Sequence, residues 1–269
     1  MHAATHPRPP GYRFAGYRLA AALLLLLPVA LAAQQAKLTL PGEPSALKSS
    51  AITTTVAPLP PLIVVGFAGG FIKRTDMVHG EVELARRLRE KYGSSIHADI
   101  FENHNGDDAH REILRLIDTA TPSVKKYPPR IILYGHSWGA SEAVEVARKL
   151  ERDGIPVLLL VEVDGVRKRH RDDSVIPANV AQAINFYQTE GLLHGRPAIR
   201  AANPATTQIV DNIHLSYKDK DIACPGYPWF ARVFTKRHIQ IENDPRVWNQ
   251  VEAMILAKLA TTVPTPTSN

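Results

Sequence analysis

The sequence predicts an α/β protein, a three-layer sandwich with a mostly parallel central sheet. Between Leu62 and Val163, four short apolar runs alternate with three helical patterns, as expected of a parallel sheet with right-handed crossovers. The fourth run, Pro156 to Val163, is almost continuously apolar, which indicates a strand covered on both faces. A serine between two glycines follows the third run directly.

The predicted strands cover residues 62–65, 96–101, 131–134, 156–163 and 208–215. The helices between the first four strands carry apolar residues on one face: Val82, Ala85 and Leu88; Ala109, Ile113, Leu116 and Ile117; Ala140, Val144, Ala147 and Leu150. We expect Asp107 or Asp108 to cap the second of these helices. Gly93 and Gly154 close the first and the third.

The region after the fourth strand is less regular. We expect a helical piece around residues 179–187 and a loop rich in proline and aromatic residues at 225–230. A last helix begins near Asp244 with Pro245 at its first position, where proline is favoured. Residues 62–260 therefore form the predicted domain, and 261–269 a disordered tail.

Residues 1–36 are predicted to be a secretory signal peptide. Three arginines precede an apolar run of 13 residues, Leu19 to Leu31, and Ala30-Leu31-Ala32 has the small-x-small pattern that leader peptidases cut. The run is too short to cross a hydrocarbon core of ~30 Å comfortably, so an uncleaved anchor is the alternative. We expect export to a periplasm or to the outside. Residues 37–61 are rich in Pro, Ser and Thr, which indicates a linker or an extended arm.

Composition excludes several classes of protein. The 269 residues are 45% apolar and 22% charged, which is ordinary for a globular protein. A chain beginning near Ala33 keeps a net charge of +3, too small to indicate a nucleic-acid partner. The basic run Arg167 to Arg171 is interpreted as a solvated loop, with contact to an anionic head group as the alternative. Cys224 is the only cysteine, so no internal disulfide can form.

The stretch Gly135-His136-Ser137-Trp138-Gly139 lies between a predicted strand and a predicted helix. This is the context of a nucleophile elbow, in which a tight turn presents a serine above the sheet. Only small residues fit beside such a turn, because strand and helix approach closely there. We therefore interpret Ser137 as a nucleophile, and His136 as a structural residue that points into the packing around the turn.

A serine needs a base that takes its proton and an acid that orients the base. In a turn of this kind both follow the serine in the chain. His238, on a loop just before the final helix, is the predicted base. Asp164 follows the fourth strand at its carboxyl end, where catalytic groups collect in open parallel sheets. Asp211, on the next predicted strand, is the rival acid. It lies inside that strand and not beyond its end, which favours Asp164.

An oxyanion hole needs two backbone N–H groups. Trp138, the residue after the serine, supplies one, and we expect Phe67 to supply the other, with Ala68 as the alternative. Both lie in the glycine-rich stretch 66–70 after the first strand. A nucleotide phosphate could use the same glycines, but the stretch lacks G-x-G-x-x-G and a Lys-Ser/Thr pair.

With GHSWG, the glycine-rich stretch, Asp164 and a late His238, the chain resembles the α/β-hydrolase superfamily in its lipase, esterase and thioesterase-like branches. The resemblance covers roughly residues 62–260. It implies attack by Ser137 on an acyl group, an oxyanion held by the amides of Phe67 and Trp138, an acyl-enzyme, and hydrolysis by water that His238 activates. The chain lacks a His-Gly pair before the glycine-rich stretch and has fewer predicted strands than is usual, which indicates a minimal version of the fold.

No metal or cofactor is expected. His104, Asp107, Asp108 and His110 lie close in sequence, but no His-x-x-x-His or cysteine pair occurs, and the aspartates serve as helix caps. A solvated loop is the preferred interpretation.

The substrate is expected to be a small-molecule or lipid ester with an apolar acyl group. Export disfavours coenzyme A thioesters, and five apolar residues lie near the predicted acid and base: Phe186, Tyr187, Leu192, Leu193 and Trp229. Core packing explains the same residues almost equally well. The alternatives are a thioesterase, a peptide or amide hydrolase, and a binding protein without catalysis. We expect a monomer. A peripheral contact of this monomer with a membrane surface is compatible with the sequence.

Overall fold

The computed structural model describes residues 59–122, 124–169 and 171–260. The predicted signal peptide, the predicted linker apart from its last three residues, and the predicted tail lie outside these ranges. None of the helices within them combines the length and the apolar character that crossing a membrane requires.

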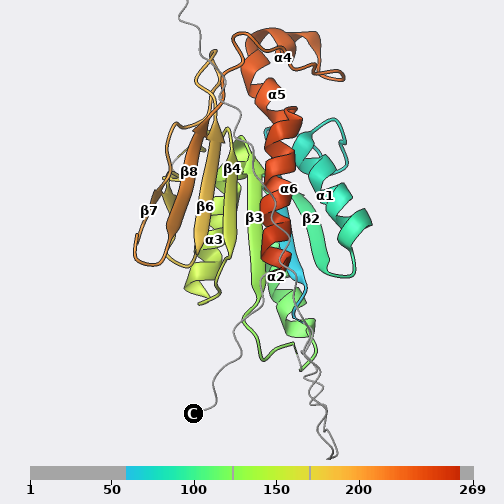
Figure 1. The fold of residues 1–269 in the computed structure, drawn as a ribbon, viewed down its shortest axis with the longest axis vertical. Coiled ribbons are helices and arrows are strands. Elements are labelled where there is room, and N and C mark those ends of the chain that lie inside the picture. Colours follow the sequence, from blue (N-terminus) through green and yellow to red (C-terminus); the bar gives the residue numbers. More distant parts are fainter. Residues whose placement is uncertain (1–58, 123, 170, 261–269) are drawn as a thin grey trace, which may run out of the picture. The chain divides into compact units, whose positions relative to one another are not determined.

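The centre of the fold is a six-stranded sheet in the order β2-β1-β3-β4-β6-β8, in which every neighbouring pair is parallel (Figure 1). The strands are β1 Leu62–Ala68, β2 Ile96–Glu102, β3 Arg130–His136, β4 Leu159–Val163, β6 Gln182–Tyr187 and β8 Gln208–His214. Two short strands, β5 Val175–Ile176 and β7 Arg200–Ala201, pair separately. The predicted parallel sheet is confirmed.

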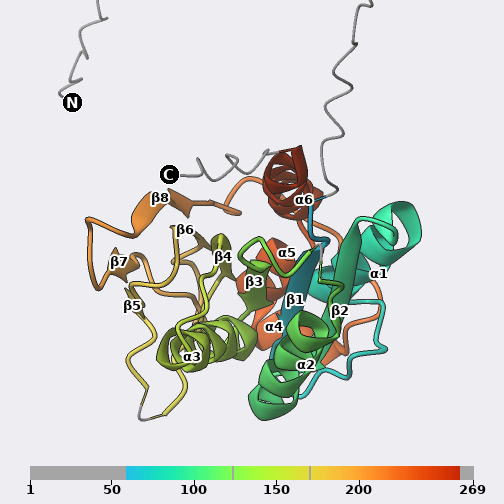
Figure 2. The same ribbon diagram turned by 90° about the horizontal axis from the view of Figure 1, so that it is seen from below.

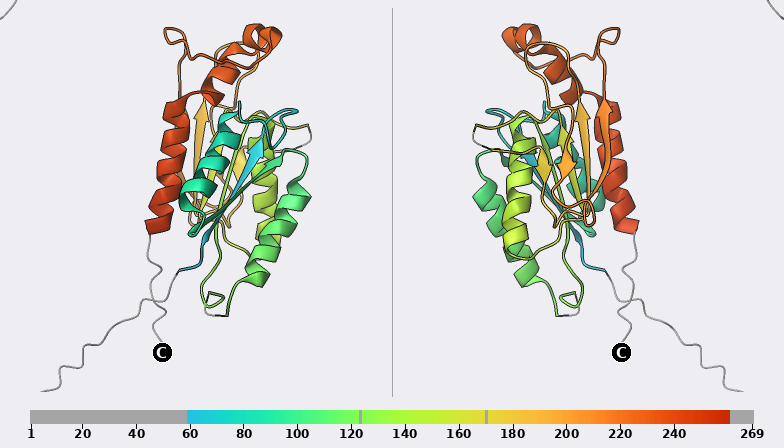
Figure 3. Two further views of the ribbon diagram at one scale, coloured as in Figure 1. Left: turned by 90° about the vertical axis from the view of Figure 1, so that its right-hand side faces the viewer. Right: turned by 90° about the vertical axis from the view of Figure 1, so that its left-hand side faces the viewer.

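Helices cover both faces of the sheet, as the three-layer prediction requires. They are α1 Gly80–Tyr92, α2 Gly106–Thr119, α3 Trp138–Arg152, α4 Trp229–Phe234, α5 Lys236–Glu242 and α6 Pro245–Ala260. Figure 2 shows α1 and α6 on one face and α2 and α3 on the other. In the edge views of Figure 3, α4 and α5 lie beyond one end of the sheet.

Each central strand divides its side chains between two hydrophobic cores. In β1, Leu62 and Val64 pack with α1 and α6, whereas Ile63, Val65 and Phe67 pack with α2 and α3. All seven residues of β1 are buried. Burial on both faces explains why these strands are continuous apolar runs in the sequence and do not alternate.

The predicted helical piece at 179–187 is wrong, because residues 182–187 form strand β6. Ala183 points into one core, whereas Ile184 and Phe186 belong to the other. This segment is too short for its periodicity to separate strand from helix. Pairing decides the outcome, since β6 hydrogen-bonds to β4 on one side and to β8 on the other. The main sheet therefore has six strands, one more than expected.

Two helix starts also differ from the predictions. Asn105 is the N-cap residue of α2, and Asp107 and Asp108 lie in its first turn, where carboxylates interact favourably with the helix dipole. The predicted loop at 225–230 ends earlier, because its last two residues begin α4. Pro245 is the first residue of α6, as predicted.

Strand β4 carries one buried acid, Glu162, whose side chain is fully buried. Its carboxylate lies 3.6 Å from Nη1 of Arg196, which contacts Asp173 more closely at 2.6 Å. Burial raises the pKa of Glu162 to about 8, against the attraction of Arg196. The folded protein therefore holds a proton here that an unfolded chain releases near pH 4.5.

The substitution Glu162→Gln tests whether Glu162 has a raised pKa in the folded protein. Between the ordinary pKa of 4.5 and about 8, the unfolded chain binds fewer protons at this site, so Glu162 lowers the stability of the parent by up to about 1.4 kcal/mol per pH unit as pH rises. The amide removes this dependence. Urea unfolding should show the variant gaining stability relative to the parent from about pH 5 to about pH 8. A difference that stays constant with pH would contradict the assignment.

Candidate active site

Ser137 lies at the turn between β3 and α3, with φ 55° and ψ −123°. A non-glycine residue rarely adopts a positive φ, and it is kept there only by the surrounding structure. Gly135 and Gly139 make the turn possible. A Cβ added to Gly135 would lie 2.3 Å from the carbonyl carbon of Gly139, and one added to Gly139 would lie 2.1 Å from the carbonyl oxygen of Phe67. Neither position has room for a side chain.

The structure brings Ser137, His238 and Asp164 together. Nε2 of His238 lies 2.9 Å from Oγ of Ser137, and Nδ1 lies 2.6 Å from Oδ2 of Asp164. All three side chains are buried. His238 is the third residue of the short helix α5, so the expected loop position is wrong. This geometry allows His238 to accept a proton from the serine while the carboxylate stabilises the imidazolium that results.

Asp164 is held by several donors besides His238. It follows β4 with φ 45°, and its carboxylate accepts hydrogen bonds from N of Gln188 at 3.1 Å, Nε2 of Gln188 at 2.8 Å and N of Gly195 at 2.7 Å. Sequence reasoning missed Gln188 and Gly195, because only the folded loop brings them to the acid. The rival Asp211 is exposed on β8 and accepts from the N–H of Asn212.

Trp138 is the first residue of α3. Its N–H has no partner inside the helix, and the helix dipole favours negative charge nearby. The glycine-rich stretch after β1 lies against the serine, since a Cβ added to Gly69 would be 3.0 Å from Cβ of Ser137. Phe67 pairs with strands on both sides, whereas Ala68 pairs with β2 alone. The second oxyanion donor, Phe67 or Ala68, stays a prediction.

His136 points into the interior beside the elbow. Its ring centroid lies 4.6 Å from that of His238, and 2% of the residue is exposed. Burial lowers the pKa of His136 to about 4, so its ring is neutral at neutral pH.

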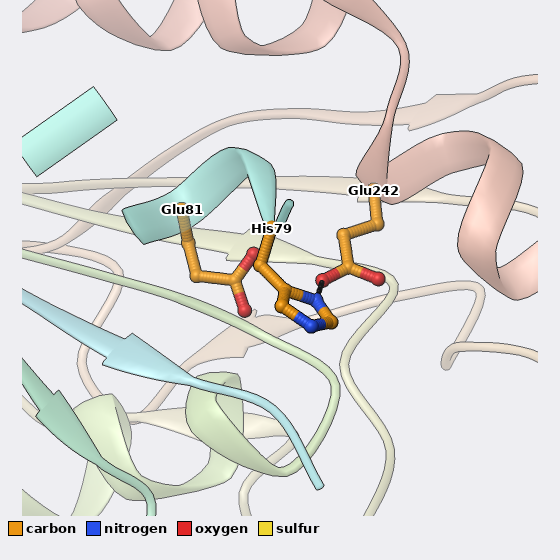
Figure 4. A group of neighbouring side chains, drawn as sticks. All are labelled: His79, Glu81 and Glu242. Carbon is orange, nitrogen blue, oxygen red and sulfur yellow. Dashed lines mark hydrogen bonds and ion pairs between the residues drawn. The ribbon is translucent and has the colours of Figure 1, made fainter. Parts of the chain in front are cut away.

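Behind His136 lies a buried group that sequence reasoning missed, formed by His79, Glu81 and Glu242 (Figure 4). Nδ1 of His79 is 2.5 Å from Oε1 of Glu242. Burial and the charge of Glu242 raise the pKa of Glu81 well above its ordinary value. Burial opposes ionisation of Glu242 too, but the neighbouring imidazoles of His136 and His79 hold its pKa below the ordinary value. A local sequence motif cannot reveal this group, because Glu242 is 163 positions from His79 in the chain.

The histidines and aspartates of the 104–110 segment do not converge. Nε2 of His104 lies 3.3 Å from Glu102, and Nε2 of His110 lies 2.5 Å from Asp153. Asp107 pairs with Lys149.

The interpretation of the basic run as a solvated loop is wrong for two of its residues. Lys168 donates to the buried carboxylate of Glu142 at 2.9 Å, and Arg171 donates to the same oxygen at 2.6 Å. Both cations are partly buried and stabilise this carboxylate, because a buried carboxylate is costly without a partner.

Three of the five residues expected to line an acyl pocket lie elsewhere. Phe186 belongs to the core under the sheet, and Tyr187 packs against His214. Trp229 lines a different cavity, with Cys224 and Ile239. A cavity of about 250 Å³ lies instead between residues 190–193 and the segment from α4 to α5; its apolar lining is Leu192, Leu193, Val233 and Phe234. We call it the α4 groove. Phe71, which is 94% exposed, packs edge-on against Trp138 beside the serine.

The family model for the thioesterase domain matches residues 60–213, a range that includes Ser137 and Asp164 and ends before His238. No curated protein matches the sequence.

Several solved structures show a weak likeness over most of the chain. A cutinase-like protein from Cryptococcus sp. is 13% identical with a TM-score of 0.39, over 76% of this chain and 98% of that one. The RedJ thioesterase of Streptomyces coelicolor is 13% identical with a TM-score of 0.37, over 79% and 100%. Human thioesterase 2 is 12% identical with a TM-score of 0.38, over 76% and 99%. The family match covers more than half of the chain, and the protein therefore belongs to the thioesterase domain family of α/β-hydrolases.

Proposed function

We propose that the protein is a serine acyl hydrolase in which Ser137 is the nucleophile, His238 the general base and Asp164 the orienting acid. The observation that carries this proposal is the continuous path from Oγ of Ser137 through the His238 ring to Oδ2 of Asp164, with contacts of 2.9 and 2.6 Å. Membership of a family of hydrolases supports it.

The reaction proceeds in two halves. Oγ of Ser137 attacks the acyl carbon while Nε2 of His238 takes the hydroxyl proton, and the oxyanion is stabilised by the amides of Trp138 and of Phe67 or Ala68. The bond to the leaving group breaks as His238 returns its proton to that group. Water then attacks the acyl-enzyme with His238 as base, and the acid leaves as Ser137 recovers its proton.

For the substrate we propose a carboxylic ester with an apolar acyl chain. The α4 groove supports an apolar chain, because leucines line one side and Val233 and Phe234 the other. The groove adjoins the residues that hold the acid, since Nε2 of Gln188 donates both to Asp164 and to the carbonyl of Leu193. A thioester is the second candidate, which the family match favours. It needs the same acyl chemistry with a thiol as leaving group.

We further propose that the protein acts after export, as a monomer that makes peripheral contact with a lipid surface. Four apolar side chains of α4 are exposed by more than half: Trp229, Phe230, Val233 and Phe234. Arg232 lies among them in sequence and Lys236 follows two residues after Phe234, and cations beside exposed aromatic groups suit an anionic membrane surface.

Substitution of the two candidate acids tests the catalytic proposal. Asp164→Asn should lower kcat for a p-nitrophenyl ester by about 10³- to 10⁴-fold, because an amide cannot stabilise the His238 imidazolium. The matched control Asp211→Asn should change kcat less than about twofold, since Asp211 is exposed. Circular dichroism should show both variants folded. Equal activity of Asp164→Asn and the parent would contradict the triad, and no turnover by the parent of any ester, thioester or amide would favour a binding protein.

The leaving group is tested by comparing one acyl chain as its p-nitrophenyl ester and as its N-acetylcysteamine thioester. The proposal predicts that a Ser137→Ala variant loses activity on both, because one nucleophile serves both. A higher kcat/KM for the ester in the parent would support an esterase. A kcat/KM at least tenfold higher for the thioester would replace the ester by the second candidate.

The role of the α4 groove is tested by Phe234→Ala. Loss of about one large apolar contact should cost ~1–3 kcal/mol in binding, or roughly 10- to 100-fold in kcat/KM, for long acyl chains. It should leave short chains almost unchanged. Phe230→Ala is the matched control, because Phe230 lies on the same helix and does not line the groove. Equal losses of kcat/KM for acetyl and decanoyl esters would mean that the acyl chain does not bind in the α4 groove.

A further inference from the structure

Four ionisable side chains from three parts of the fold converge behind the catalytic histidine. His79 is the residue before α1 and Glu81 the second residue of that helix, His136 ends β3, and Glu242 ends α5. Figure 4 shows the side chains of His79, Glu81 and Glu242 turned toward one another. We call these four residues the His79–Glu242 cluster.

The ligand atoms lie close together. One ligand atom each from His79, Glu81 and Glu242 lies within 4.8 Å of the other two. Nδ1 of His136 is 3.6 Å from Oε1 of Glu242 and 3.9 Å from Oε1 of Glu81. Metal–ligand bonds of about 2.0–2.2 Å place tetrahedral ligand atoms roughly 3.3–3.5 Å apart. The printed His136 contacts to the two glutamates lie within about 0.6 Å of that separation, and the other ligand atoms would have to shift further to reach it.

Several atoms of the cluster have no hydrogen-bond partner within the described part of the chain. These are Oε2 of Glu81 and both ring nitrogens of His136, in residues that are 0% and 2% exposed. Buried polar atoms are paired in the great majority of cases, and each exception needs an explanation. A bound cation would take up a lone pair from each side chain.

The charges of the cluster also favour a bound cation. Two carboxylates are buried here, and among the described residues neither forms an ion pair with a lysine or an arginine. Within the described ranges, the ion-pair partners of these carboxylates are the imidazoles of His79 and His136. One divalent cation held by two carboxylates and two neutral imidazoles gives a site with no net charge. Burial of such a site is far less costly than burial of unpaired anions.

We propose that the His79–Glu242 cluster binds one divalent transition-metal ion of the zinc type. Two nitrogen and two oxygen donors suit zinc, whereas calcium and magnesium prefer oxygen alone. Nε2 of His79 faces Oδ2 of Asp76 at 3.6 Å, and a carboxylate in that position commonly orients a ligating imidazole. The site is independent of the hydrolase proposal, because Ser137 and Asp164 contribute no ligand to it.

The metal would have a structural role. It would link the start of α1, the end of β3 and the end of α5, the helix that carries His238. His136 would transmit that restraint, since its ring packs against the ring of His238. The four residues would therefore position His238 and would not take part in the chemistry. The stability of the protein reports metal binding directly.

The test uses the full chain, stripped with a chelator and then titrated with ZnCl₂. Calorimetry should show about one tight equivalent of zinc, with a rise in Tm of several degrees. Cobalt(II) at the same site should give the visible absorption of a four-coordinate ion. Ser137→Ala should bind zinc as the parent does, so loss of hydrolase activity and loss of the metal site are separable.

Variants identify the ligands. Glu81→Gln and His79→Gln should each weaken zinc binding at least 100-fold and abolish the rise in Tm. His104→Gln is the control, because His104 is an exposed histidine outside the cluster, and it should bind zinc as the parent does. No zinc binding by the stripped parent, or equal binding by Glu81→Gln, would overturn the proposal. The first outcome would mean that shared protons alone balance the two carboxylates.

Discussion

The close approach of three backbone segments around Ser137 is the constraint on which the site depends. The end of β1, the end of β3 and the start of α3 leave no space for a Cβ at Gly135 or Gly139. Such packing forces Ser137 into a backbone conformation that costs of order 1–3 kcal/mol. The turn is held by hydrogen bonds from N of Ser137 to the carbonyl of Val163 and from N of Val166 to the carbonyl of Ser137, at 3.0 and 3.2 Å.

Two residues of the proposed catalytic triad, Ser137 and Asp164, have strained backbone conformations. Among the described residues, Ser137 and Asp164 are the two non-glycine residues with positive φ, and each directly follows a central strand. Both are held at the same edge of the sheet by a core that is packed on both faces. Neither conformation would persist on a less rigid support. His238 comes from a helix outside the sheet, so its place depends on how α5 packs and on the His79–Glu242 cluster beneath it.

The sequence was sufficient for the parallel sheet, the elbow and the proximity of Ser137 to His238 and Asp164, because those features follow from local patterns and from chain order. Asp164 was preferred to Asp211 because it stands beyond its strand, and the structure places it against His238. The segment at 182–187 could not be assigned in this way, since its pairing with β4 and β8 depends on residues far along the chain. For the same reason the contacts of Gln188, Gly195 and Glu242 were missed.

An activated Ser137 should react covalently with a fluorophosphonate. The full chain is treated with this probe, and the modified residue is found by peptide mapping with mass spectrometry. We expect one phosphonyl group per chain, attached to Ser137. It should form much more slowly when His238 is replaced by alanine and should be absent from Ser137→Ala. No modification of the folded parent, or modification at another residue, would contradict it.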